Sequence, residues 1–114
     1  MQKSDEPYIR HVFDAITLME GYVKGLDRDK FLDDKSKMIQ DAVIREFEII
    51  GEAVKRLSDE IKKKNPSLPW RDIGDMRNKL THEYFAVDLN VVWGVIENDL
   101  PVLKKSMTEL LNSL

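Results

Sequence analysis

The sequence predicts an all-α protein, folded as an up-and-down bundle of four to five helices. Apolar residues recur at spacings of three and four over most of the chain, which is the period of an amphipathic helix. No segment alternates apolar and polar residues with β-branched enrichment, so a sheet is not expected. The connections between the periodic segments are short, which favours antiparallel neighbours. With 114 residues, of which 42% are hydrophobic, the chain is expected to form one domain over residues 1–114.

The first helix is expected to begin after Ser4 or Asp5, both good capping residues, and to end at Gly25. Its apolar stripe comprises Ile9, Val12, Phe13, Ile16, Met19 and Val23. A polar connector over residues 27–34 follows, and Phe31 and Leu32 should hold it to the core.

The second helix has the strongest sequence pattern, because its apolar positions keep the helical period for over 20 residues. These positions are Ile39, Ala42, Val43, Phe47, Ile50, Ala53, Val54, Leu57 and Ile61. Residues 65–69 hold two prolines and should end the helix. Gly51, in mid-helix, costs about 1 kcal/mol relative to alanine and suggests the close approach of another helix.

A third helix is predicted over residues 72–82 and a fourth after Asp88, which is a plausible cap. The inward side chains of the fourth helix should be Val91, Val92, Val95, Ile96 and Leu100. Pro101 should kink or divide this helix. The amphipathic tail that continues it contains Leu103, Met107, Leu110, Leu111 and Leu114.

The composition excludes several classes of protein. No cysteine is present, so a disulfide framework, a thiolate zinc site, an iron–sulfur cluster and a cysteine nucleophile are ruled out. No apolar run approaches the ~20 residues of a membrane span, and the first residues do not resemble a signal peptide. We therefore expect a soluble, cytoplasmic protein with no membrane partner.

The charge is unevenly distributed along the chain. The net charge is −3, yet residues 62–82 contain six basic and two acidic residues. A basic segment in an acidic protein could receive a phosphate-bearing ligand. It could equally be a solvated helix end, because lysines favour the last turn of a helix.

The candidate chemistry lies at the end of this basic segment. Of the two histidines, His11 has no catalytic constellation near it in the sequence, whereas His82 follows Arg77 and Asn78 closely. Histidine moves protons near neutral pH, and arginine binds phosphate oxygens with two parallel donors. Asparagine can orient a nucleotide or the imidazole. Together they suffice for metal-independent attack of a ribose 2′-hydroxyl on the adjacent phosphate; a capped, salt-bridged helix end is the alternative.

Neither a metal nor a cofactor is expected. Histidines and cysteines do not cluster as zinc ligands would, and no glycine-rich phosphate loop is present. The acidic pairs Asp27/Asp29 and Asp33/Asp34 are interpreted as connector and capping residues.

Several motifs resemble HEPN-domain proteins of the HepT type. The stretch Arg77-Asn78-Lys79-Leu80-Thr81-His82-Glu83-Tyr84 matches the Arg-x-x-x-x-His-x-Tyr signature of that family. Further similar segments are residues 49–57, 69–73, 87–89, 92–93 and 99–101. The resemblance covers roughly residues 39 to 104.

The resemblance implies an HEPN-like helical domain that acts as an endoribonuclease toxin. Its partner would be a minimal nucleotidyltransferase antitoxin, and its substrate RNA. Arg77 and His82 would be catalytic, with Asn78 in support, and two copies of the motif would face one cleft in a homodimer. Tyr84 matches the tyrosine that receives AMP from the transferase; otherwise it is an aromatic residue that packs beside Phe85.

Two questions stay open at this point. Glu52 could hold Arg77 in place, or could lie on the solvent face with Arg45. The whole domain could also be a non-catalytic helical binding module that holds a nucleotidyltransferase or a nucleotide. A dimerisation domain with a relic motif is a third possibility.

Overall fold

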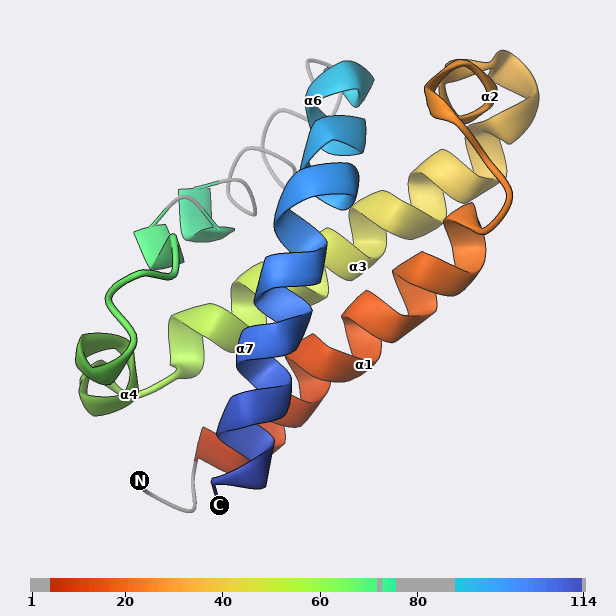
Figure 1. Ribbon diagram of the computed structural model, residues 1–114. Helices are drawn as coiled ribbons and strands as arrows, with labels where there is room; N and C mark the ends of the chain where they lie inside the picture. The colour runs from red at the N-terminus through yellow and green to blue at the C-terminus, as the bar shows by residue number, and fades with distance from the viewer. Residues whose placement is uncertain (1–4, 72, 76–87, 114) are drawn as a thin grey trace.

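The structure is a computed structural model, and it describes residues 5–71, 73–75 and 88–113. All regular structure in these ranges is helical, which confirms the predicted all-α bundle (Figure 1). The elements are α1 (Glu6–Val23), α2 (Arg28–Leu32), η2 (Asp34–Ser36), α3 (Lys37–Arg56), α4 (Asp59–Lys64), α6 (Leu89–Gly94), η4 (Val95–Asp99) and α7 (Leu100–Asn112).

The three long helices form the core. Helix α1 packs against both α3 and α7, and α3 runs antiparallel to α1 (Figure 1). Each helix contributes a buried row at spacings of three and four, as the periodicity predicts. The rows are Ile9, Val12, Ile16 and Met19 on α1, Val43, Phe47, Ile50 and Val54 on α3, and Leu100, Leu103, Met107 and Leu110 on α7. Burying such a side chain stabilises the fold by about 1.5–3 kcal/mol.

The connector between α1 and α3 is more ordered than predicted. It contains the short helix α2 and the 3₁₀ turn η2, because Asp27 and Asp33 cap them: their Oδ1 atoms accept bonds from the backbone N–H of Lys30 and Lys35, both at 2.8 Å. The amide of Gln40 on α3 donates to the Phe31 carbonyl at 2.8 Å. Phe31 is fully buried, which confirms its predicted anchoring role.

The prediction of one continuous second helix from residue 39 to residue 61 is wrong. Helix α3 ends at Arg56, and α4 begins after Ser58, whose hydroxyl accepts a bond from the Ile61 N–H at 3.3 Å. The buried carboxylate of Asp5 accepts bonds from the Ser58 backbone N–H at 2.9 Å and from the Ser58 hydroxyl at 2.7 Å. Asp5 thus stabilises the break instead of capping α1 with its side chain.

The last helical segment is continuous but changes its winding. Asp88 caps α6 as predicted, accepting a bond from the Asn90 N–H at 2.9 Å. The π-helical turn η4 follows, with a bond from the Leu100 N–H to the Val95 carbonyl. Pro101 lies in the first turn of α7. Because proline has no N–H, a regular α-helical bond is missing there, which explains the interruption that its position predicts.

One inward position of this segment is wrong. Val91 is 56% exposed, whereas Trp93, absent from the predicted inward set, is buried with its ring centroid 5.2 Å from that of Phe31. The larger Trp93 indole, and not the Val91 side chain, packs in the core. Within the third helix predicted over residues 72–82, residues 73–75 are helical, and residues 70 and 71 before its predicted start are helical too. The other positions of the predicted helix lie outside the described residues.

The Asp5–Ser58 contact should matter for stability. We expect Asp5→Ala to lower the free energy of unfolding by about 1–3 kcal/mol, because it leaves part-buried donors of Ser58 without their acceptor. Urea denaturation followed by circular dichroism measures the change. The matched control is Asp14→Ala on the exposed face of α1, which should change stability by no more than about 0.5 kcal/mol. Equal effects of the two substitutions would contradict the assigned role of Asp5.

Candidate functional site

The predicted site residues Arg77, Asn78, His82 and Tyr84 lie outside the described residues, so their proposed roles stay predictions. The structure describes the two chain segments that lead to them. These are residues 65–71 and 73–75 on the N-terminal side and residues 88–94 on the C-terminal side.

The N-terminal segment turns a corner that hydrogen bonds hold. The backbone carbonyl of Asn65 accepts bonds from the Trp70 indole Nε1 at 2.9 Å and from the Leu68 N–H at 3.2 Å. The side-chain amide of Asn65 donates to the Ile61 carbonyl of α4 at 2.9 Å. Leu68 is buried, and the Ile73 N–H donates to the Pro69 carbonyl at 3.0 Å. Hydrogen bonds therefore connect helix α4 with the helical residues 70, 71 and 73–75 at a single turn of the chain.

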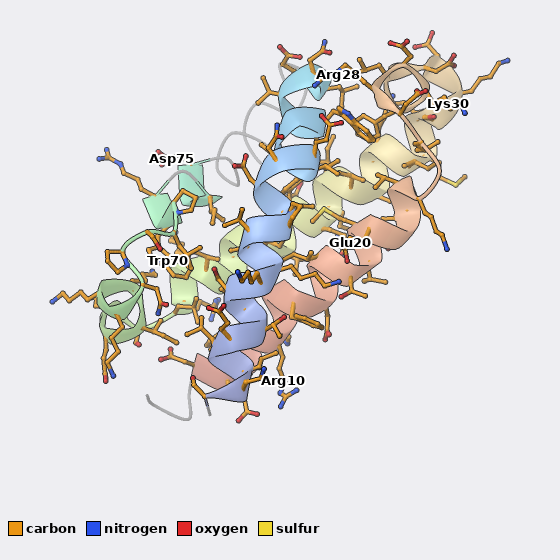
Figure 2. The ribbon with its side chains drawn as sticks, in the orientation of Figure 1. Arg10, Glu20, Arg28, Lys30, Trp70 and Asp75 are labelled. Carbon is orange, nitrogen blue, oxygen red and sulfur yellow. The ribbon has the colours of Figure 1, made fainter. Side chains whose placement is uncertain are left out.

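The C-terminal segment is held by an arginine of the connector. The guanidinium of Arg28 donates to the backbone and side-chain oxygens of Asn90 at 3.2 and 3.1 Å, and lies 3.9 Å from the Glu97 carboxylate. Figure 2 shows Arg28 beside the upper end of α6. Both chain segments that flank the predicted catalytic stretch are thus fixed to the bundle.

The N-terminal segment also borders a cavity, whose other walls come from α3, η4 and α7. It has a volume of about 370 Å³ and lies between α3, residues 67–73 and the junction of η4 with α7. Ile73 from the first flank, Val95 from η4 and Phe47 from α3 line it. Its polar lining residues are Ser67 and Asp99. No described cation or imidazole lines this cavity, so within the described chain it is an apolar pocket.

Glu52 lies half-buried on α3, within hydrogen-bonding distance of the arginine one turn later. Its Oε1 accepts a bond from the Arg56 Nε at 3.3 Å. The neighbouring Tyr8 phenol of α1, together with Glu52, raises the pKa of Arg56 above its ordinary value. Arg45 is exposed. The hypothesis that Glu52 holds Arg77 stays a prediction, since Arg77 is outside the described residues.

His11 lies on the exposed surface of α1, with its ring edge-on to that of Tyr8 at a centroid distance of 6.3 Å. This position agrees with the sequence, which shows no catalytic constellation near His11. His11 therefore offers a matched control for substitutions of His82, the other histidine of the chain.

Among residues 5–71, 73–75 and 88–113, no three His, Cys, Asp or Glu side chains are grouped so that they could hold a metal ion. In the same ranges, no helix combines the length and the apolar character that crossing a bilayer requires.

The residues that sequence reasoning missed are those that shape the corner. Ser58 begins α4, and the signal for it was local: a serine followed by two acidic residues is typical of a helix start. The partner of Ser58, Asp5, is 53 residues away, and no local pattern indicates it. The bond between Trp70 and Asn65 was likewise not foreseen.

Comparisons with known proteins point to a single family. The family profile described as "Ribonuclease HepT-like" matches residues 12–110. A protein of Thermococcus cleftensis named "Probable ribonuclease HepT" is 40% identical over 96% of this chain and 98% of its own length. A candidate RNase of Caldanaerobacter subterraneus subsp. tengcongensis is 38% identical over 96% of both chains.

A longer relative comes from Methanocaldococcus jannaschii, and its name joins a gamma-glutamylcyclotransferase to a candidate RNase. It is 40% identical over all of this chain, which spans 50% of the length of that relative. No solved structure matches the chain.

Proposed function

The chain belongs to the HepT-like ribonuclease family, and we propose that it is a metal-independent endoribonuclease. The observation that carries the proposal is the family match over residues 12–110, which includes the Arg77–Tyr84 stretch. The basic character of residues 62–82 supports a polyanionic substrate. We place this activity in the cytoplasm, where the RNA substrates are.

The proposed reaction is an internal transesterification. A base removes the proton of a ribose 2′-hydroxyl, the 2′-oxygen bonds to the adjacent phosphorus, and the bond to the 5′-oxygen breaks as that oxygen gains a proton. His82 moves protons, since an imidazole titrates near neutral pH. Arg77 neutralises the charge that gathers on the phosphate oxygens. Asn78 orients the nucleotide or the imidazole. The products are a 2′,3′-cyclic phosphate and a 5′-hydroxyl.

We propose that the active form is a homodimer in which two copies of the motif face one cleft. The reaction profits from both a general base and a general acid, and each chain supplies one His82. Two chains supply two imidazoles. The cleft would then combine Arg77 and His82 from different subunits.

We further propose that the protein is the toxin of a toxin–antitoxin pair, neutralised by a minimal nucleotidyltransferase. Tyr84 is the proposed acceptor of AMP, and it lies two residues after His82 in the sequence. An AMP group there would add bulk and a negative phosphodiester close to Arg77 in the chain. The guanidinium would then bind that phosphodiester instead of the substrate phosphate. Glu52 is a proposed positioning residue for Arg77.

Substitution of the catalytic pair tests the activity. Arg77→Ala and His82→Ala should each lower the rate of RNA cleavage by ~10²–10³ or more, because each removes a group that acts on the reacting phosphate or its protons. The assay follows a labelled RNA in the presence of EDTA, with circular dichroism as the measure of folding. His11→Ala is the control and should keep full activity. Near-full activity of either site variant would refute the assignment, and a wild-type chain that never cleaves RNA would favour the non-catalytic binding module.

The same two variants test the shared cleft. An equimolar mixture of the Arg77→Ala and His82→Ala chains should regain part of the activity if each cleft draws the two residues from different subunits. A mixture that stays inactive, or a chain that sediments only as a monomer at micromolar concentration, would argue for sites within single subunits.

Tyr84→Phe tests control by modification. The variant should keep cleavage activity, because the phenol has no assigned role in the reaction, but should escape neutralisation by the transferase. Mass spectrometry of the protein co-expressed with the transferase should find an added AMP on the peptide that contains Tyr84. If Tyr84→Phe is still neutralised and the wild-type peptide is unmodified, the transferase acts by binding alone.

A further inference from the structure

We propose that the last turn of α4 (Lys62, Lys63 and Lys64) and Arg71 form a docking surface for the phosphate backbone of the RNA substrate. We call these four residues the α4 basic surface. The inference rests on the proposed ribonuclease function and extends it, because it assigns substrate binding to residues outside the Arg77–Tyr84 stretch.

The orientation of α4 is the first argument. Ser58 caps the start of α4, the Asp5 carboxylate holds Ser58, and Ile61 is buried. With these anchors on the core side, the lysines project from the far end of the helix: Lys63 and Lys64 are exposed and Lys62 is half-buried. Had α3 continued through residue 61 without a break, the lysines would extend it along its own axis.

The corner after α4 is the second argument. The carbonyl of Asn65 accepts hydrogen bonds from both the Leu68 N–H and the Trp70 indole, so the chain makes a tight turn. Arg71 is one of the helical residues that follow this turn. The Arg71 side chain is 94% exposed. In Figure 2, Trp70 and Asp75 lie on the side of the molecule away from Lys30. The lysines and Arg71 therefore flank one turn of the chain that hydrogen bonds hold together.

The charges of the surface are available to a ligand. Within the described residues, Lys62 and Lys63 have no recorded ion pair, and Lys64 lies 3.0 Å from the exposed Glu60 carboxylate. Arg71 is 4.0 Å from Asp75, with both side chains exposed. Exposed pairs of this kind contribute little in water, so a phosphate can replace the carboxylate. The other acidic residue of α4, Asp59, lies one helical turn before Lys63, and the part of the chain that the structure describes shows no ion pair between the two.

The place of the α4 basic surface in the sequence, shortly before the predicted catalytic stretch, is the third argument. Arg71 is six residues before Arg77 in the sequence, and Ile73 lines the cavity that also borders η4 and α7. A strand of RNA held at the α4 basic surface would thus lead toward the segment that carries the predicted catalytic pair. Phosphate contacts position a strand without reading its sequence, so this surface should bind RNA irrespective of sequence.

The test compares two triple variants of the full chain. One is Lys62→Gln/Lys63→Gln/Lys64→Gln; the matched control is Lys24→Gln/Lys30→Gln/Lys35→Gln, which removes the same charge from exposed lysines near α2. The probe is a labelled 2′-O-methyl RNA oligonucleotide, which lacks the attacking hydroxyl, and binding is measured by anisotropy over a range of salt concentrations.

The α4 variant should reduce the dependence of log affinity on log salt by about 2, since each phosphate contact with a single strand contributes roughly 0.7. The control variant should keep the wild-type slope. Replacing the three α4 lysines with arginine should preserve the slope because the charges remain. If the triple variant loses helicity, Lys63→Gln alone should still reduce the slope by roughly 0.7.

Three results would overturn the inference. The first is an α4 variant with the same slope as the control, and the second is loss of RNA binding in the arginine variant. The third is an unchanged slope for RNA together with lost binding of poly-glutamate, which would assign the surface to an acidic protein. Cleavage of unmodified RNA by the wild-type chain is scored separately, so failure of the catalytic proposal is distinguished from failure of the docking surface.

Discussion

The antiparallel packing of α1 on α3 is the constraint on which the rest of the structure depends. It joins two buried rows whose spacings of three and four match, and α7 adds a third row against α1. Because the two helices run in opposite directions, the start of α1 lies beside the end of α3. This places Asp5 within hydrogen-bonding distance of Ser58, although 53 residues separate them in the sequence.

The contact between Asp5 and Ser58 links the core to the chain segment that precedes the predicted catalytic stretch. At Ser58 the chain leaves the axis of α3, and the short helix α4 and the corner at Asn65 redirect it. Lys62, Lys63, Lys64 and Arg71 consequently lie beside the three-helix core, and Leu68 and Ile73 from the same part of the chain line the cavity between α3 and α7. The three-helix core thus holds a short polar segment, fixed by hydrogen bonds, that carries the basic side chains.

Local periodicity in the sequence predicts the long helices and their buried faces. It does not predict features that depend on contacts between residues far apart in the chain. The apolar rows of the long helices and the Asp88 cap follow from spacing and residue type, and the structure confirms them. Local patterns do not predict the break at Ser58, because the carboxylate that stabilises it belongs to Asp5, directly before the start of α1. Val91 was assigned inward because its spacing fits, but packing of Trp93 against Phe31 decided the orientation. The predicted catalytic stretch rests on a sequence motif, which names residues without giving their geometry.

We propose that this chain cleaves RNA by attack of the 2′-hydroxyl on the adjacent phosphate. The chemical nature of the product ends tests this mechanism, and mass spectrometry determines it after cleavage of a defined RNA in EDTA. We expect a 2′,3′-cyclic phosphate on one fragment and a 5′-hydroxyl on the other, with no cleavage where a single 2′-deoxy nucleotide precedes the scissile phosphate. Products with a 3′-hydroxyl and a 5′-phosphate, or cleavage beside the 2′-deoxy nucleotide, would contradict it.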